Sequence, residues 1–231
     1  MTKPAFFITG TDTNVGKTQA ACLIAKSFRD AGLRVGVMKP VETGCPVIGE
    51  KIIPQDALKL REASGTEADL DLINPYRFTA PLAPDIAARL FKATIDFNRI
   101  RDIFVGLQAA HDVMIVEGAG GLLAPAAEGR SMAELAVFLG APLLIVSANR
   151  LGTINHTLLT VNCARQMGLS IKGIILNNPV DSGSDLSAKY NRLEIERLSG
   201  VPVLFETPYS PDPASAPMLL KKKEVEKLLN T

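Results

Sequence analysis

The stretch that decides the fold of this chain is Gly10-Thr11-Asp12-Thr13-Asn14-Val15-Gly16-Lys17-Thr18. It follows the apolar run Ala5–Ile8 directly and opens a helix-like stretch that extends to residue 31. Glycine lets the backbone curl close to phosphate oxygens, and the N–H groups at a helix N-terminus supply positive potential. A lysine in this position neutralises terminal phosphates, and the following threonine can bind Mg²⁺. The order strand, loop, helix therefore predicts a nucleotide-binding site.

The loop departs from the usual G-x-x-x-x-G-K-[ST] spacing, because its first glycine, Gly10, stands one position earlier than the pattern requires. The loop is thus one residue longer than the standard one. A chance Gly-Lys-Thr at a turn and helix start is the alternative interpretation. The strand before the loop and the helix after it are the context that the motif demands, and both are indicated by the sequence.

Composition favours one sizeable α/β domain spanning residues 1–231, since 47% of the 231 residues are hydrophobic and can fill a substantial core. The formal charge is +1, and the only run of like charges is Lys221–Lys223, so nothing indicates nucleic-acid or membrane binding. The apolar run near the N-terminus is too short for a signal peptide, which favours a cytoplasmic protein. The three cysteines have no C-x-x-C spacing, which argues against a zinc site.

Strands and helices alternate along most of the chain. Strands are expected at 5–8, 35–38, 113–116, 142–146, 171–176 and 201–205, and helices at 17–31, 56–63, 86–91, 95–110, 131–139, 154–167, 186–198 and 218–229. Residues 45–54 and 69–84 show no clear period and are expected to be loops, as is the glycine-rich run 118–121. This alternation predicts a doubly wound α/β fold, resembling phosphate-loop NTPases, with a mainly parallel sheet and helices on both faces.

Polar residues follow several of these strands. Lys39 to Thr43 follow the second strand, Glu117 the third, Asn149 to Thr153 the fourth and Asn177 the fifth. Because open α/β sheets bind ligands at the carboxyl ends of their strands, we expect these segments to converge with the phosphate loop. The predicted active site lies at that edge.

The chemistry of these residues suggests phosphoryl transfer. One lysine suffices to hold nucleotide phosphates, so Lys39 could stabilise an anion that develops between the γ-phosphate and an acceptor; a solvated lysine at a strand end is the alternative. Glu117 stands where an acid would bind Mg²⁺ directly or through water, or it could cap a turn. Asp56 by itself indicates a helix N-cap. His111 and His156 have no nearby serine or cysteine partner in the pattern, so structural roles are expected for both.

Five segments together resemble the dethiobiotin synthetase family, ATP-dependent enzymes late in biotin synthesis. They are Gly10-Thr-Asp-Thr-Asn-Val-Gly-Lys-Thr18, Lys39-Pro-Val-Glu-Thr-Gly44, Val116-Glu-Gly-Ala-Gly-Gly121, Leu151-Gly-Thr-Ile-Asn-His156 and Gly173-Ile-Ile-Leu-Asn177. The resemblance spans nearly the whole chain. Although many ATPases share the first segment, the five in this order and spacing are specific to the family.

The resemblance implies a reaction in which 7,8-diaminopelargonate and CO2, supplied as bicarbonate, form a carbamate. ATP phosphorylates the carbamate to a carbamic-phosphoric anhydride, and the second amine then closes the ureido ring and releases phosphate. Lys17 would hold the β- and γ-phosphates, Lys39 would stabilise the carbamate and the phosphoryl group, and Thr13 and Thr43 would bind the diamine or carbamate. Thr18, Asp56 and Glu117 would surround Mg²⁺.

The resemblance also implies a wider binding surface. ATP would lie against Asn14, Val15, Gly16, Lys17, Thr18, Gln19, Asp56, Glu117, Gly118, Ala119, Gly120, Asn177, Asn178, Glu206, Thr207 and Pro208, with adenine near the last five. The family is homodimeric, which would place Gly152, Thr153, Asn155 and Tyr190 across the interface, against the substrate carboxylate of the partner. The sequence departs from the family at Asn14, where members often carry an acid.

Two alternatives stay open. One is a nucleotide switch resembling the MinD and ParA ATPases, although their signature lysine, four residues before the last glycine of the loop, is replaced here by Asp12. The other is a ligase resembling the cobyrinate amidase-type synthetases, which usually carry a glutamine-hydrolysing domain that we do not expect in this chain. ATP hydrolysis that does not depend on the diamine would favour the switch.

Overall fold

The computed structural model describes residues 3–178, 185–207, 220 and 222–230. Its centre is a six-stranded sheet, in the order β12-β11-β10-β1-β7-β2, in which every neighbouring pair is parallel. The strands are β1 Ala5–Gly10, β2 Val35–Met38, β7 Val113–Gly121, β10 Leu143–Ala148, β11 Ile171–Asn177 and β12 Val203–Thr207. The predicted parallel, doubly wound α/β sheet is confirmed.

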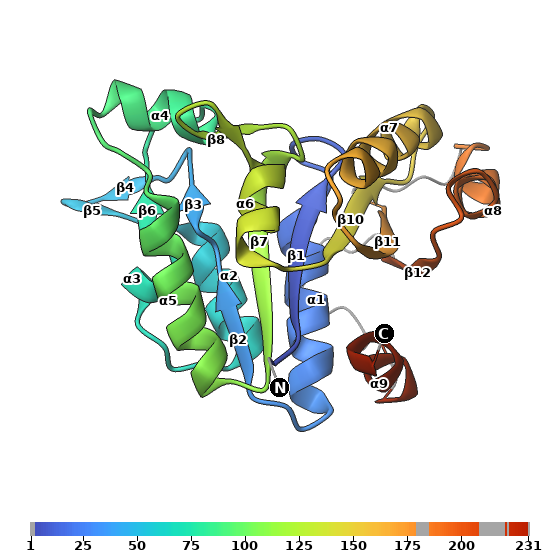
Figure 1. Ribbon diagram of the computed structural model, residues 1–231, viewed down its shortest axis with the longest axis horizontal. Coiled ribbons are helices and arrows are strands. Elements are labelled where there is room, and N and C mark those ends of the chain that lie inside the picture. Colours follow the sequence, from blue (N-terminus) through green and yellow to red (C-terminus); the bar gives the residue numbers. More distant parts are fainter. Residues whose placement is uncertain (1–2, 179–184, 208–219, 221, 231) are drawn as a thin grey trace.

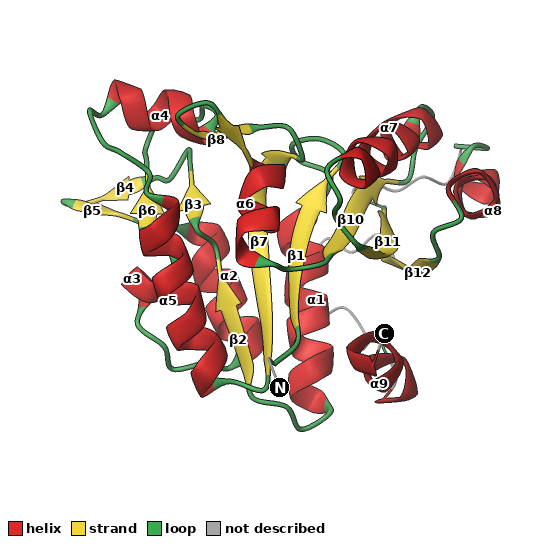
Figure 2. Cartoon of the chain, in the orientation of Figure 1, coloured by secondary structure: helices red, strands yellow, loops and turns green. Residues whose placement is uncertain are grey.

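Helices cover both faces of this sheet (Figure 2). They are α1 Lys17–Asp30, α2 Gln55–Ser64, α3 Leu70–Ile73, α4 Pro84–Leu90, α5 Phe97–Ala110, α6 Met132–Leu139, α7 Thr153–Gln166, α8 Ala188–Ser199 and α9 Lys222–Asn230. Three small two-stranded pairs flank the sheet: β3 Val41–Glu42 with β6 Tyr76–Arg77, β4 Val47–Ile48 with β5 Lys51–Ile52, and β8 Pro125–Ala127 with β9 Arg130–Ser131.

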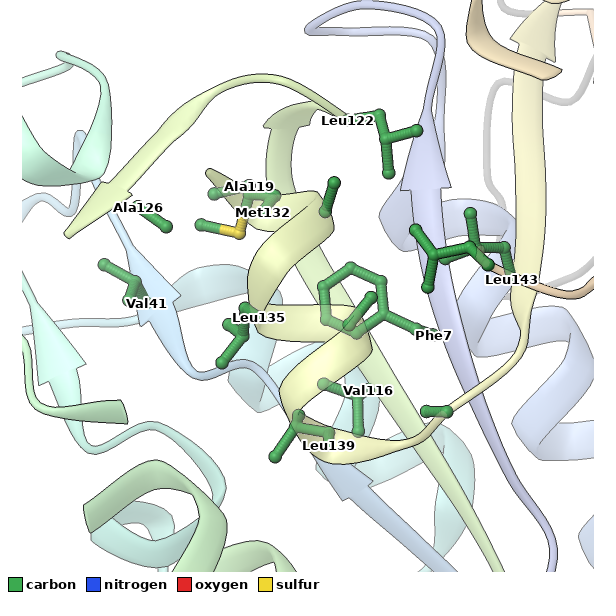
Figure 3. Packing of buried hydrophobic residues seen from close by; sticks show 14 of the residues in the cluster. Phe7, Val41, Val116, Ala119, Leu122, Ala126, Met132, Leu135, Leu139 and Leu143 are labelled. Carbon is green, nitrogen blue, oxygen red and sulfur yellow. The ribbon is translucent and has the colours of Figure 1, made fainter. Parts of the chain in front are cut away.

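The alternation of side chains along each strand divides the core into two layers. Phe7 points to the layer that contains helices α5 to α8, whereas its neighbours Phe6 and Ile8 point to the layer of α1, α2 and α9. Figure 3 shows the first layer, where Phe7 and Val116 pack against Leu135 and Leu139 of α6. Because both faces are covered by helices, the strands are apolar on both sides, as parallel sheets require.

Several predicted boundaries are wrong. The run Gly118–Gly121, expected as a loop, continues strand β7, because Gly121 still pairs with Gly10 of β1. The region 45–54 forms the antiparallel pair β4–β5, and 69–84 contains α3 and β6. These short elements carry too few residues to show a period. The expected helix at 218–229 begins at Lys222 within the described residues, and positions 218, 219 and 221 lie outside them.

The carboxyl ends of the sheet strands meet at one edge (Figure 1). The phosphate loop leaves β1 there, β3 and β8 lie over the same edge, and α7 starts from it. Met38, the last residue of β2, pairs with Val116 of β7, and this register places Lys39, directly after β2, beside Glu117 of β7. The expected convergence is therefore present.

Candidate active site

The phosphate loop is held from behind by strand β11. Asn177, at the end of that strand, donates a hydrogen bond from Nδ2 to the Val15 carbonyl oxygen at 3.0 Å. Gly16 is the N-cap of α1 with φ of 92°, and a Cβ atom there would lie 1.9 Å from Asn177 Nδ2. Glycine is thus required at position 16 both by the left-handed backbone and by the close approach of Asn177.

Lys17 lies over the loop that precedes it. Its Nζ donates a hydrogen bond to the carbonyl oxygen of Asp12 at 2.8 Å, and the side chain is mostly buried. Burial, followed by the positive charge of Lys39, lowers the pKa of Lys17 to about 8. A bound anion close to Nζ would raise this pKa again and favour the charged form of Lys17, so the lysine is suited to hold phosphate oxygens.

Lys39, directly after β2, and Glu117, within β7, form a buried ion pair. Lys39 Nζ lies 2.6 Å from Glu117 Oε1, 3.5 Å from Asp56 Oδ2 and donates to the Gly118 carbonyl oxygen at 3.1 Å. Burial alone would lower the pKa of Lys39, but the carboxylates of Glu117 and Asp56 outweigh it and hold this pKa above its usual value. Lys39 therefore stays charged in an environment that largely excludes water.

Glu117 has one carboxylate oxygen in use and one free. Oε1 accepts hydrogen bonds from Lys39 and from the Thr18 hydroxyl, the latter at 2.8 Å, whereas Oε2 is buried and has no hydrogen-bond partner within the described part of the chain. An unpaired buried carboxylate oxygen is costly, so a ligand at this point would be favourable.

The residues present fit a magnesium ion. Thr18, Asp56 and Glu117 offer one hydroxyl and two carboxylates, all of them oxygen donors: Thr18 bonds to Glu117 Oε1, and the carboxylates of Asp56 and Glu117 both lie within 4 Å of Lys39 Nζ. Mg²⁺ prefers oxygen ligands and is usually bound through one or two carboxylates together with substrate phosphates and water. Within the described residues there is no group of three or more His, Cys, Asp or Glu side chains that could hold a metal ion.

These side chains line one cavity of about 720 Å³. The lining includes the following residues predicted from the sequence: Thr13, Asn14, Gly16, Lys17, Thr18, Lys39, Thr43, Asp56, Glu117, Ala119 and Gly120. It also includes residues that the prediction missed: Glu42, Lys59, Pro81, Leu82, Ala83, Pro84, Gly121 and Ala124. Glu42 stands within the quoted segment 39–44 and could have been noticed there, whereas the position of 81–84 depends on long-range packing.

Other predicted residues lie outside this lining. Val15, Gln19 and Gly118 are neighbours of lining residues in the chain but are not part of the lining. Asn177 is fully buried, and its amide oxygen accepts a hydrogen bond from Thr207 Oγ1. Asn178 donates to the Thr207 carbonyl oxygen at 2.6 Å, and Glu206 lies 3.6 Å from Arg192. Pro208 falls outside the described residues.

The predicted interface residues belong to α7, its N-cap and α8, two helices that lie side by side (Figure 1). Gly152 is the N-cap of α7, and Asn155 lies in its first turn. Thr153 is buried, with its hydroxyl 2.6 Å from Ser147 Oγ. Tyr190 of α8 is 60% exposed and is surrounded in the sequence by exposed leucines. None of the four side chains reaches the cavity of its own chain.

No helix in the described part of the chain is both long enough and apolar enough to cross a membrane. The three cysteines are free thiols. His111 caps the end of α5 and bonds to Leu107 and Thr66, which is a structural role.

The fold is similar to a chain of the MinC:MinD cell division protein complex from Aquifex aeolicus. The TM-score is 0.55, the sequence identity is 16%, and the match covers 90% of this chain and 82% of that one. Identity at this level shows the fold alone. It therefore agrees with the parallel α/β fold and favours no function.

Comparisons of sequence are more specific. The family model described as "AAA domain" matches residues 4–216. The chain is 46% identical to the ATP-dependent dethiobiotin synthetase BioD of Anaeromyxobacter dehalogenans (strain 2CP-C), over 89% of this chain and 90% of the relative. It is 41% identical to the ATP-dependent dethiobiotin synthetase BioD of Bacillus subtilis (strain 168), over 88% and 86%. The chain belongs to the family of ATP-dependent dethiobiotin synthetases.

Proposed function

We propose that the protein is a ligase of biotin biosynthesis that closes the ureido ring of dethiobiotin from 7,8-diaminopelargonate and CO2, using ATP and Mg²⁺. The observation that carries this proposal is the buried pair Lys39–Glu117 at 2.6 Å, beside Thr18 and Lys17 in one cavity. Two lysines and an oxygen-rich cation site suit a reaction between two anions, a carbamate and ATP.

The atoms balance in three steps. One amine of the diamine adds to CO2 and loses a proton, which forms the carbamate. A carbamate oxygen attacks the γ-phosphorus of ATP and ADP leaves, which forms the carbamic-phosphoric anhydride. The second amine then attacks the carbonyl carbon and loses a proton, and phosphate leaves as the ring closes.

The residues of this chain divide that work. Lys17 would hold the β- and γ-phosphates, and Lys39 would face the carbamate and the phosphoryl group in transfer. Thr18, Asp56 and Glu117 would hold Mg²⁺, which when bound would neutralise phosphate charge. Thr13 and Thr43, both in the cavity lining, would orient the amines and the carbamate.

Adenine would lie beyond the phosphate loop, near Asn177, Asn178 and residues 206–208. Asn177 already connects the loop to β12 through its bonds to Val15 and Thr207. We expect its role to include holding the loop in shape as well as bordering the base. The enzyme is expected to work in the cytoplasm, where ATP is available.

We further propose a homodimer formed through α7 and α8. Leu151, Leu159, Leu186 and Leu193 are each more than half exposed, together with Tyr190. Apolar side chains gathered on two adjacent helices favour a protein partner. In such a dimer Gly152, Thr153, Asn155 and Tyr190 would face the substrate of the other subunit.

The test uses purified protein, ATP, Mg²⁺ and labelled bicarbonate, with and without 7,8-diaminopelargonate. We expect an acid-stable labelled product and ADP release only when the diamine is present. ATP hydrolysis at the same rate without the diamine, and no labelled product, would contradict the proposal and favour a nucleotide switch.

A further inference from the structure

Glu42, which the predicted roles leave unused, connects strand β3 to the start of helix α2. Its Oε1 accepts a hydrogen bond from the backbone N–H of Asp56 at 2.9 Å, and its Oε2 accepts one from the N–H of Ala57 at 3.0 Å. The residue is 5% exposed. Both carboxylate oxygens thus face a helix that begins more than ten residues later in the chain.

Helix α2 has no cap of its own. Its N-cap residue is Pro54, whose side chain makes no hydrogen bond to the first turn. The first N–H groups of a helix need a partner from elsewhere, and a carboxylate there also interacts favourably with the helix dipole. Glu42 supplies that partner from strand β3, so its position decides where the first turn of α2 lies.

The first turn of α2 carries Asp56, which faces the cation site. Asp56 Oδ2 lies 3.5 Å from Lys39 Nζ, and Lys39 in turn lies 2.6 Å from Glu117. Lys39 and Glu42 belong to the same short segment. Asp56 is therefore held at both its backbone and its side chain by residues 39–44. Its N–H bonds to Glu42, and its carboxylate contacts Lys39.

We propose that Glu42 is a positioning residue for the metal site, which holds the carboxylate of Asp56 in place through the backbone of α2. This rests on the proposed role of Asp56 as a magnesium ligand. Residues that orient the ligands of a metal typically change metal affinity by about 10- to 100-fold when they are removed. Because Glu42 also borders the cavity, direct contact with an amine of the substrate is the competing explanation.

The experiment measures metal binding directly. Mn²⁺, whose free form is read by electron paramagnetic resonance, is titrated into protein that is in slight excess over a non-hydrolysable ATP analogue. Glu42→Ala should weaken Mn²⁺ binding about 10-fold or more. Glu42→Gln, which keeps one acceptor oxygen for the helix, should fold and show a smaller loss. The matched control is Glu134→Ala, which removes a carboxylate that accepts a backbone N–H at the start of α6, outside the cavity lining. It should leave Mn²⁺ binding unchanged.

A double variant separates positioning from direct ligation. If Glu42 acts through Asp56, adding Glu42→Ala to Asp56→Asn should cause little further loss. Full additivity of the two losses would overturn the proposal, and so would wild-type Mn²⁺ affinity in both Glu42 variants. A raised KM for the diamine with unchanged Mn²⁺ binding would show contact with substrate instead. Since Mn²⁺ binding needs no ring closure, failure of the proposed reaction would appear separately, as absent bicarbonate incorporation by the wild-type protein.

Discussion

Removal of Lys39 should affect stability and catalysis by different amounts and for different reasons. In Lys39→Ala, Glu117 would keep its hydrogen bond from Thr18 but lose its only charged partner within 4 Å among the described residues. The Glu117 side chain is fully buried, and its second oxygen already has no hydrogen-bond partner in the part of the chain that the structure describes. Breaking a buried ion pair by removing one member costs about 3 to 5 kcal/mol, because it leaves an uncompensated charge.

The lower end of that range applies here, since the truncated side chain would open Glu117 to water in the cavity. For a chain of this size, about 3 kcal/mol corresponds to a fall in Tm of roughly 6 to 12 °C. Turnover should fall about 100- to 1,000-fold, the loss typical of removing one group that stabilises charge in the transition state. ATP binding should persist, because Lys17 and the phosphate loop are unchanged.

The assay combines thermal unfolding with incorporation of labelled bicarbonate into acid-stable product. The double variant Lys39→Ala/Glu117→Gln removes the unpaired charge, so it should recover most of the lost Tm without recovering turnover. Lys26→Ala is the matched control, because Lys26 pairs with Asp30 at 2.6 Å on the surface of α1, where a pair contributes at most about 1 kcal/mol. Near-normal ring formation in Lys39→Ala, or an unchanged Tm, would refute the reasoning.

Three further predictions concern the loop, its lysine and the α7–α8 surface. Gly16→Ala should abolish ATP binding in calorimetry, because the added Cβ meets Asn177, whereas Gly49→Ala, also at positive φ but with open space around it, should bind ATP normally. Normal ATP binding by the first variant would contradict the described loop. The pKa of Lys17 is lowered from 10.5 to about 8 in the folded protein, so between about pH 8 and pH 10.5 the unfolded chain binds one more proton than the folded one. The free energy of unfolding should therefore rise with pH in that window. ATP affinity should fall there by up to about tenfold per pH unit, because the neutral lysine no longer attracts phosphate. Lys17→Arg should remove this pH dependence of ATP binding, and its persistence would assign the effect to another group. Leu193→Glu on α8 should shift the protein to monomers in sedimentation and reduce turnover, whereas Leu90→Glu on α4, at a similarly exposed leucine, should not; equal effects would argue against the proposed interface.

The phosphate loop, the parallel sheet and the convergence of Lys39 and Glu117 could all be predicted from sequence. Each depends on local signals: apolar runs that form strands, glycine that allows a tight loop, and polar residues where the runs end. In a parallel sheet those ends share one edge, so local patterns imply the position of the site. The same reasoning was wrong for 118–121, where glycines suggested a loop but pairing with β1 continued the strand.

Asp56 shows where local patterns stop. From the sequence alone it is a helix cap, and the resemblance to a family was needed to suggest a metal ligand. In the structure the capping bonds of that helix come from Glu42, so the Asp56 side chain is left to face Lys39. Glu42 of β3 takes over the capping role that the sequence assigned to Asp56 of α2, and no pattern within either segment indicates this.

The sequence by itself determined the elements, their order and the chemical types that gather at one edge of the sheet. Only the tertiary structure decided which atoms meet: Lys39 with Glu117, Asn177 with the back of the loop, and Glu42 with the first turn of α2. It also left one oxygen of Glu117 buried, without a hydrogen-bond partner among residues 3–178, 185–207, 220 and 222–230. The physical reason is that periodicity arises from contacts a few residues apart. The contacts of Lys39, Asn177 and Glu42, in contrast, join segments that are distant in the chain, and their geometry depends on how the whole core packs.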